Sequence, residues 1–204
     1  MQPLHDHNSS SDGHAKPGRF GGMASTIAVL LIAPLVALFL TSFIFQSYQV
    51  DGPSMETTLY NNDRLLVWKL PKTWAKITGH HYIPKRGDVI IFVERGYGDI
   101  DGKQLIKRVI GLPGERVVIK NDVVTIYNDE HPNGFKPDAT LPYGNVIGET
   151  SNNVDITVPD GKLYVMGDNR PGSMDSRAFG PINAEDIVGK LVMRVWPINE
   201  AKRF

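Results

Sequence analysis

The sequence predicts a mainly β fold, an antiparallel β-sheet domain that follows one N-terminal transmembrane helix. Three observations support this fold class. Residues 23–45 form an apolar run without a charge, and a polar tail precedes them. Short runs rich in β-branched and aromatic residues follow, and turn-forming residues separate them. Such spacing is typical of antiparallel sheets that are built from hairpins.

The N-terminal part predicts a tail and a membrane anchor. Residues 1–22 are rich in Ser, Gly, His and Asp, and we expect a disordered cytoplasmic tail. Residues 23–45 would span roughly 34 Å as a helix, enough to cross a hydrocarbon core of ~30 Å. A cleaved secretory signal is disfavoured, because the run exceeds the usual ~7–15 apolar residues and no small-x-small site follows. Lys16 and Arg19 precede the run and the next basic residue is Arg64, which predicts a cytoplasmic N-terminus.

Residues 47–204 are expected to form one extracytoplasmic β-rich domain. Lys120–Asp122 reads as a hairpin turn between two Val/Ile runs. Residues 128–161 are rich in Asn, Asp, Gly and Pro, which indicates a small polar insertion. The predicted strands are 64–70, 88–93, 104–110, 116–119, 123–127, 162–166 and 187–196.

Composition excludes several classes of function. The 22 basic and 22 acidic residues balance, so the charge gives no reason to expect a nucleic-acid partner. No cysteine is present, which excludes disulfides, thiolate catalysis and cysteine-based zinc sites. The adjacent His80 and His81 fall in a predicted loop, so no metal or other cofactor is expected.

Ser54 is the candidate nucleophile. It lies just beyond the apolar run, after Gly52 and Pro53, which favour a tight turn. A serine hydroxyl needs a base, and the histidines available in the folded part, His80, His81 and His131, lie in predicted loops. The Gly-x-Ser-x-Gly and Ser-x-x-Lys arrangements are both absent.

Lys107 is the remaining candidate base. In the strand predicted at 104–110 it shares a face with Leu105 and Val109. Burial disfavours the ammonium, and a fall of roughly 2 pKa units from ~10.4 would let the lysine act near neutral pH. Taken alone, Lys107 reads mainly as a lysine that extends into solvent from an edge strand.

Four motifs together resemble the type I signal peptidases, membrane-anchored Ser-Lys proteases that remove signal peptides from exported proteins. Residues 52–59 are similar to their serine box, Ser-Met-x-Pro-Thr-Leu, and residues 86–92 to the Arg-Gly-Asp strand that follows. Residues 107–115 are similar to the lysine box, and residues 167–177 to the box Gly-Asp-Asn-(x)₃-Ser-x-Asp-Ser-Arg. The motifs occur in the family's order, and a lysine at 107 indicates the bacterial or organellar branch.

The resemblance implies a role for each matching position. Ser54 would be the nucleophile, with its backbone N–H as one oxyanion donor, and Lys107 the general base. Ser173 would hydrogen-bond the lysine amine and orient it. Two ion pairs would support the site: Asp175 with Arg177, and Asp168 with Arg108.

The sequence departs from the family pattern at two positions. Gly52 stands where some members carry a serine whose hydroxyl supplies the second oxyanion donor. In this chain a second donor from the Gly52 region could therefore not be a side-chain hydroxyl. Thr57 replaces the usual proline of the serine box, which should loosen the turn without changing the chemistry.

The resemblance predicts an endopeptidase of the bacterial cytoplasmic membrane that cleaves secretory precursors after small-x-small residues. Two alternatives remain: a self-cleaving Ser-Lys protease, and a non-catalytic membrane-anchored β-module that binds partner proteins. Apolar residues near the serine are candidates either for contact with the lipid bilayer or for the core: Met55, Leu59, Tyr60 and Trp74.

Overall fold

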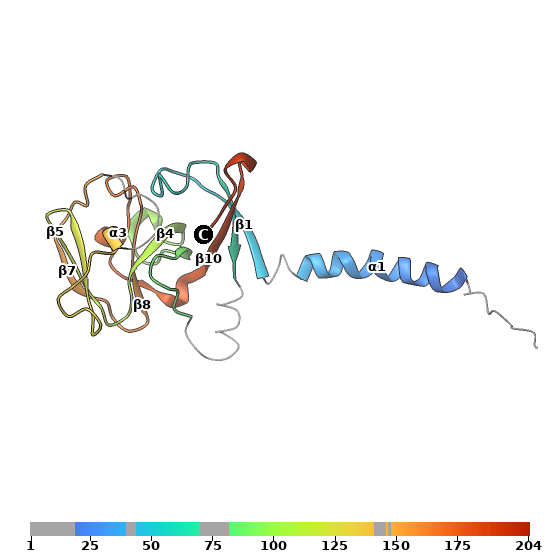
Figure 1. Ribbon diagram of the computed structural model, residues 1–204, viewed down its shortest axis with the longest axis horizontal. Coiled ribbons are helices and arrows are strands. Elements are labelled where there is room, and N and C mark those ends of the chain that lie inside the picture. Colours follow the sequence, from blue (N-terminus) through green and yellow to red (C-terminus); the bar gives the residue numbers. More distant parts are fainter. Residues whose placement is uncertain (1–18, 40–43, 70–81, 141–145, 147) are drawn as a thin grey trace, which may run out of the picture. The chain divides into compact units, whose positions relative to one another are not determined.

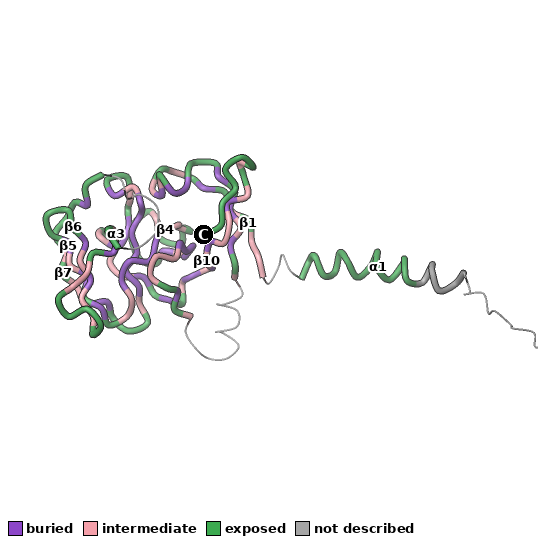
Figure 2. Tube along the Cα trace, in the orientation of Figure 1, coloured by how far each residue is buried: buried purple, intermediate pink, exposed green. Residues whose placement is uncertain are grey.

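The computed structural model describes residues 19–39, 44–69, 82–140, 146 and 148–204. The chain divides into two compact units, residues 1–39 and 40–204. The first contains helix α1 (Arg19–Phe39), with Pro34 inside it and exposed apolar side chains from residue 25 onward (Figure 2). Within the described part of the chain, no helix combines the length and the apolarity needed to cross a membrane. Residues 1–18 of the predicted tail and residues 40–43 of the apolar run lie outside the described residues.

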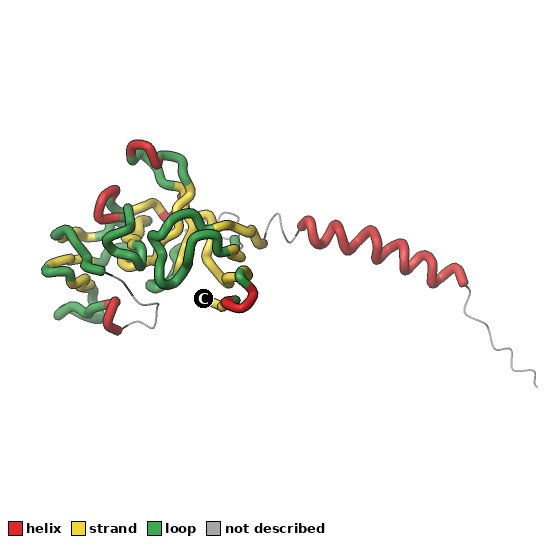
Figure 3. The backbone as a smooth tube through the Cα atoms, turned by 90° about the horizontal axis from the view of Figure 1, so that it is seen from above, coloured by secondary structure: helices red, strands yellow, loops and turns green. Residues whose placement is uncertain are grey.

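The second unit is mainly β and its strand pairs are antiparallel, as predicted (Figures 1 and 3). An eight-stranded sheet has the order β1-β2-β10-β3-β4-β8-β9, and β11 pairs with β10. A three-stranded sheet has the order β6-β5-β7. The strands are β1 (Phe45–Gln49), β2 (Arg64–Trp68), β3 (Val89–Val93), β4 (Gln104–Gly111), β5 (Arg116–Lys120), β6 (Val123–Tyr127), β7 (Val154–Thr157), β8 (Lys162–Met166), β9 (Ile182–Asn183), β10 (Ile187–Trp196) and β11 (Lys202–Arg203).

In the part of the chain that the structure describes, five short helical turns connect these strands. Two are α-helical, α3 (Pro137–Thr140) and α4 (Ser176–Phe179). Three are 3₁₀ turns, η2 (Gly98–Ile100), η3 (Ala184–Asp186) and η4 (Ile198–Glu200). The predicted hairpin turn is present between β5 and β6, where Asn121 and Asp122 both have positive φ, at 49° and 62°. Two such residues in a row match the twist of the flanking strands.

Three apolar clusters form the core. One lies among β3, β4, β8 and β10 around Phe92 and Val165. Another joins the three-stranded sheet to the end of β4 through residues such as Val117 and Ile110. The third contains Met55 and Leu59, whose side chains are fully buried. The last cluster fixes the segment that carries Ser54.

Candidate active site

Ser54 lies on a turn that is anchored at both ends. Backbone bonds from Val50 N–H to the Asp63 carbonyl and from Asn62 N–H to the Val50 carbonyl, each 2.9 Å, close the loop between β1 and β2. Met55 and Leu59 are core residues, so the candidate bilayer contacts at these two positions are wrong. Tyr60 is 45 % exposed, and Trp74 lies outside the described residues. The buried side chains of Met55 and Leu59 therefore anchor this turn in the core, while Ser54 on the same turn is half-buried.

Lys107 lies on β4, and its side chain reaches Ser54 on the segment between β1 and β2. Its Nζ lies 2.7 Å from Ser54 Oγ and donates a second bond of 3.0 Å to the Ile106 carbonyl. The side chain is 3 % exposed, and burial lowers the pKa of Lys107 from 10.5 to about 8, against the opposing pull of Asp175 and Asp168. A substantial fraction of the amine is thus neutral just above neutral pH.

Ser173 approaches the pair without forming the expected hydrogen bond. Its Oγ is buried and has no hydrogen-bond partner within the described residues. A Cβ added to Gly167 would collide with both Ser173 Oγ and the Ser54 carbonyl, so all three groups crowd one point. In this arrangement the Lys107 amine uses the Ile106 carbonyl as its second partner instead of Ser173.

Asp175 and Arg177 form the ion pair that the sequence led us to expect. Both carboxylate oxygens of Asp175 accept a bond of 2.8 Å from the Arg177 guanidinium. Asp175 also accepts from the Gly167 N–H at 3.0 Å, and its side chain caps α4 by accepting from the Arg177 N–H. Asp175 therefore fixes the backbone beside Ser173 and lies near enough to Lys107 to raise its pKa.

Asp168 and Arg108 form the second expected pair. Arg108 donates to Asp168 through Nε at 2.8 Å and through a terminal nitrogen at 2.5 Å, and both side chains are almost fully buried. The Thr58 hydroxyl donates to the same carboxylate at 2.5 Å. This cluster connects the serine turn, the lysine strand and the loop after β8.

A cleft of about 120 Å³ opens beside the Ser54–Lys107 pair. Its walls come from two stretches of chain, Tyr48–Asp51 and Gln104–Lys107. The partner strand β8 pairs with β4 only from Arg108 onward, and β1 is an outer strand of its sheet. Both walls thus expose a strand edge within the described residues. Unpaired edges of this kind can accept an extended peptide as an added strand.

The candidate oxyanion donors differ in availability. The Ser54 N–H donates to no acceptor within the described residues. The Gly52 N–H donates to Asn61 Oδ1 at 3.0 Å, where Gly52 adopts a φ of 96° that favours glycine. Of these two amides, the Gly52 N–H is therefore occupied, whereas the Ser54 N–H has no acceptor among the described residues.

The similarity to known proteins agrees with this geometry. The family model described as "Signal peptidase, peptidase S26" matches residues 23–196. The chain belongs to the S26 signal peptidase family. Signal peptidase I P of Bacillus subtilis subsp. natto is 36 % identical over 181 residues, which cover 86 % of this chain and 90 % of that protein. Signal peptidase IB of Staphylococcus aureus strain COL is 32 % identical, over 86 % of this chain and 91 % of that protein.

The chain is also similar to solved signal peptidase I structures. The crystal structure of a signal peptidase I from Enterococcus faecalis V583 is 30 % identical, covers 54 % of this chain and 97 % of that chain, and has a TM-score of 0.40. Membership of the S26 family makes the chain a serine endopeptidase, which confirms the predicted enzyme class and disfavours the non-catalytic β-module.

Several residues that shape this S26 site are not apparent from the sequence alone. Thr58 is one, because its partner Asp168 lies 110 residues away. Asn169 is another: its backbone N–H donates to the Ser54 carbonyl and its side chain to the Pro53 carbonyl. Arg170 is fully buried and holds the Gly167 carbonyl. The sequence signal for these residues is their position inside the motifs, Thr58 in the 52–59 box and Asn169 and Arg170 in the 167–177 box.

Proposed function

We propose that Ser54 and Lys107 form a catalytic dyad that removes signal peptides from exported precursor proteins. The observation that carries this proposal is the 2.7 Å separation between Lys107 Nζ and Ser54 Oγ. A nucleophile and base must lie within about 2.6–3.2 Å for direct proton transfer. The lowered pKa of Lys107, near 8, supports a neutral Lys107 amine at the pH at which the enzyme would act.

In the first half of the reaction, Ser54 attacks the scissile carbonyl. The neutral amine of Lys107 takes the Ser54 hydroxyl proton as Oγ forms its bond to the carbonyl carbon. The carbonyl oxygen becomes an oxyanion, and the free N–H of Ser54 is placed to stabilise it. The Lys107 ammonium then gives its proton to the leaving amine, the C–N bond breaks, and an ester on Ser54 remains.

In the second half, water replaces the leaving amine. Lys107 takes a proton from the water as its oxygen attacks the ester, and returns a proton to Ser54 Oγ when the C–O bond breaks. Ser173 would act as a supporting group, because its buried hydroxyl lies near the Ser54 carbonyl and has no hydrogen-bond partner within the described residues. Asp175, Arg177, Asp168 and Arg108 act by holding the backbone around the dyad.

The cleft supports a substrate bound in extended form. A peptide that adds to the edge at Gln104–Lys107 would point alternate side chains at the protein. We propose cleavage after small-x-small sequences, because this is the specificity that the resemblance to the type I signal peptidases implies.

We place the protein in the bacterial cytoplasmic membrane. The uncharged run that begins at residue 23 and lies within α1 would provide the anchor, and Lys16 and Arg19 before it would keep the N-terminus inside. Ser54 lies 15 residues after Phe39, the last residue of α1. The dyad would therefore work at the outer surface of the bilayer, where a precursor's apolar segment is still embedded.

Cleavage of a signal-bearing precursor by the detergent-solubilised full chain tests the proposal. Ser54→Ala and Lys107→Met should each abolish cleavage while the protein stays folded by circular dichroism. The exposed Ser47 and Lys103 offer matched controls, and Ser47→Ala and Lys103→Met should cut like the wild type. Full activity in Lys107→Met would remove the lysine from the mechanism. Sequencing of the product's new N-terminus then tests the small-x-small rule.

A further inference from the structure

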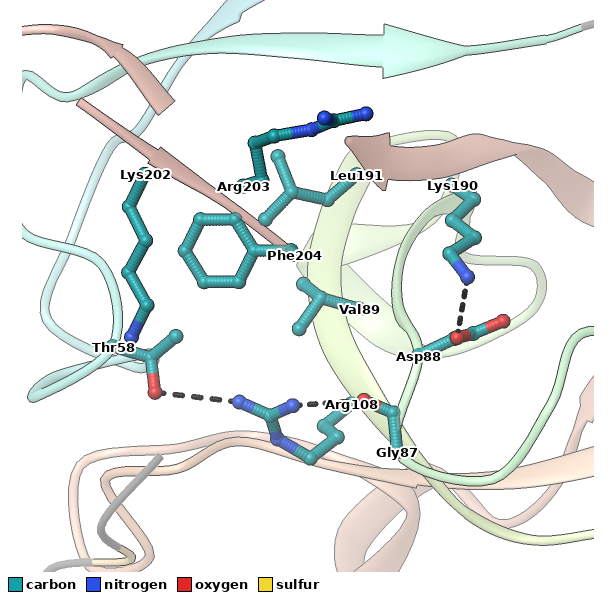
Figure 4. Close-up of a pocket in the computed structure, with 10 residues that line it drawn as sticks. All are labelled: Thr58, Gly87, Asp88, Val89, Arg108, Lys190, Leu191, Lys202, Arg203 and Phe204. Atoms are coloured by element: carbon teal, nitrogen blue, oxygen red, sulfur yellow. Dashed lines mark hydrogen bonds and ion pairs between the residues drawn. The ribbon is translucent and has the colours of Figure 1, made fainter. Parts of the chain in front are cut away.

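Asp51 is the acidic residue in the lining of the cleft beside Ser54 and Lys107. Its side chain is exposed, and its carboxylate has no hydrogen bond or ion pair within the described residues. Asp88 behaves differently: it lines a separate cavity of about 260 Å³, where its Oδ1 lies 2.7 Å from Lys190 Nζ (Figure 4). The charge of Asp51 is therefore available to a molecule that occupies the cleft.

The lining of the cleft carries one net negative charge when the dyad is ready to react. The proposed mechanism starts from the neutral amine of Lys107, and burial keeps Tyr48 neutral by raising the pKa of its hydroxyl. Two cations adjoin the walls without lining the cleft. Arg64 pairs with Gln49 at the β2 edge of β1, and Lys103 lies four residues before Lys107, roughly 13 Å away along a strand. The wall nearest the dyad is therefore acidic.

The alternation of burial shows which way the Asp51 side chain points. Val50 belongs to an apolar core cluster and Tyr48 packs against it, whereas Gln49 and Asp51 are exposed. Successive side chains of an extended strand point to opposite faces. The Asp51 carboxylate thus lies on the outer face of this wall.

The backbone groups of Asp51 face the open edge of the same wall. Val50 donates its N–H to the Asp63 carbonyl and accepts from the Asn62 N–H, so both of its groups point to the β2 side. In an antiparallel pair the next residue turns its N–H and carbonyl to the other edge. A peptide added there would place the side chain of its opposite residue on the same face as the Asp51 side chain.

We propose that Asp51 selects a basic side chain at the middle residue of the small-x-small sequence, an inference that rests on the proposed function. The walls Tyr48–Asp51 and Gln104–Lys107 both run toward the dyad, so the cleft lies to one side of it. The three residues of small-x-small all precede the cleaved bond and would occupy this side. Their two small side chains point inward, and the middle one points outward beside Asp51, the residue of its wall nearest to Ser54 in the sequence.

The expected preference is modest and sensitive to salt. Two unit charges about 6 Å apart in water attract enough to change a binding constant about threefold. A lysine at the middle residue would gain this factor and a glutamate would lose it, so the two should differ about tenfold. Salt screens exposed charges, and the difference should nearly disappear at about 1 M salt.

Three versions of a signal-bearing precursor test the proposal, with Ala-Lys-Ala, Ala-Gln-Ala or Ala-Glu-Ala before the same cleaved bond. The detergent-solubilised full chain is assayed at low ionic strength and about pH 9, above the Lys107 pKa of about 8. The value of kcat/KM should fall in that order, about tenfold from lysine to glutamate. Equal values for lysine and glutamate would overturn the proposal.

Matched variants assign the preference to Asp51. Asp51→Asn should cut the lysine and glutamate precursors at similar rates, and Asp51→Glu should keep most of the discrimination. Asp129→Asn makes the same change at an exposed position outside the cleft and should discriminate like the wild type. Full discrimination in Asp51→Asn would show that other charges produce it.

The same three residues placed directly after the cleaved bond locate the contact. Asp51→Asn should have no effect on the discrimination at that position. An Asp51-dependent preference there, with none at the middle residue, would refute the side of the dyad to which the cleft is assigned.

Binding separates this proposal from the proposed function. Labelled peptides with the three sequences are titrated against the Ser54→Ala chain, and fluorescence anisotropy should give affinities in the order lysine, glutamine, glutamate. This order without cleavage by the wild type would support Asp51 and refute the dyad chemistry. Cleavage without any charge preference would refute Asp51 alone, and the absence of both binding and cleavage would overturn both proposals.

Discussion

The Thr58 hydroxyl lies 2.5 Å from Asp168 Oδ2, although the two residues are 110 positions apart in the sequence. This contact joins the segment that carries Ser54 to the loop after β8, in a place where both side chains are buried. Asp168 already accepts two bonds from Arg108. Thr58 supplies the hydroxyl donor that completes the carboxylate's set of partners.

Thr58→Val should therefore destabilise the protein by about 1–3 kcal/mol, since it keeps the shape but leaves a buried carboxylate oxygen with one donor fewer. Thr58→Ser, which retains the hydroxyl, should lose markedly less. Urea unfolding of the two variants provides the comparison. Equal stability of the valine and serine variants would mean that the contact contributes nothing.

The pH dependence of cleavage follows from Lys107. The proposed mechanism needs the neutral amine, so activity should be low at pH 6 and rise through a limb centred near the Lys107 pKa of about 8. The negative charge of Asp175 raises this pKa. Asp175→Asn, where it folds, should move the limb to lower pH. A limb that stays fixed in this variant would point to another titrating group.

Burial of Lys107 also makes stability depend on pH. The folded-state pKa of Lys107 lies below 10.5, so between about pH 8 and 10.5 the unfolded chain holds a proton that the folded chain lacks. The contribution of Lys107 to the free energy of unfolding therefore rises with pH through that window, by about 3 kcal/mol in total. Below pH 8 the buried amine is charged, and the protein bears the full cost of burying that charge.

The variant Lys107→Met removes this cost. It should be more stable than the wild type at pH 7, and the advantage should shrink by about 3 kcal/mol on going to pH 10.5. Urea titrations at the two pH values give the difference, from which the shared titration of other groups cancels. For Lys103→Met, at an exposed position, the difference in stability from the wild type should be the same at both pH values.

The sequence predicts the strands well where alternation is long. All seven predicted strands are present, and β6, β8 and β10 have the predicted bounds. The strand β2 ends at Trp68, two residues early. The strands β1, β7, β9 and β11 were missed, because two to five residues, several of them polar, carry too little periodicity.

For the site as well, the sequence motifs predict some of the contacts, while others depend on residues that only folding brings together. The motifs bring Ser54 and Lys107 together correctly, as they do both ion pairs of the supporting residues. They do not predict the unpartnered hydroxyl of Ser173, because side-chain rotamers depend on packing around Gly167. Nor do they identify a link such as Arg170–Asp138, which only the folded chain brings within 2.6 Å.

Arg170 gives a prediction about that link. Its guanidinium is buried and donates to Gly167, Thr150 and Asp138, and thereby ties the 128–161 segment to the box at 167–177. Arg170→Met should cost about 3–5 kcal/mol, because it breaks a buried pair. Hydrogen exchange should rise at the amides of Ala139 and Thr140, which donate to the Lys136 carbonyl.

The Arg116–Asp155 pair is the control for Arg170. It also involves this part of the chain, but both side chains are more than half exposed. Arg116→Met should change stability and exchange little, since exposed pairs contribute little. If the two variants behaved alike, burial would not be the reason for the effect at Arg170.

Gly167 gives the sharpest test of how closely the site is packed. A methyl group there would collide with the Ser54 carbonyl and with Ser173 Oγ. Because the Ser54 carbonyl is backbone, relief requires the serine turn to move, and a shift of about 1 Å in a reacting group can cost about a hundredfold in rate. Gly167→Ala should therefore lose about that much activity in the precursor assay.

Gly161→Ala separates this effect from simple backbone strain. Gly161 has a φ of 71° with open space around it, so the variant should lose about 1–2 kcal/mol of stability but keep its activity. Wild-type cleavage by Gly167→Ala would show that the turn tolerates displacement, and would refute the close approach of Gly167 to Ser54 as a requirement for the reaction.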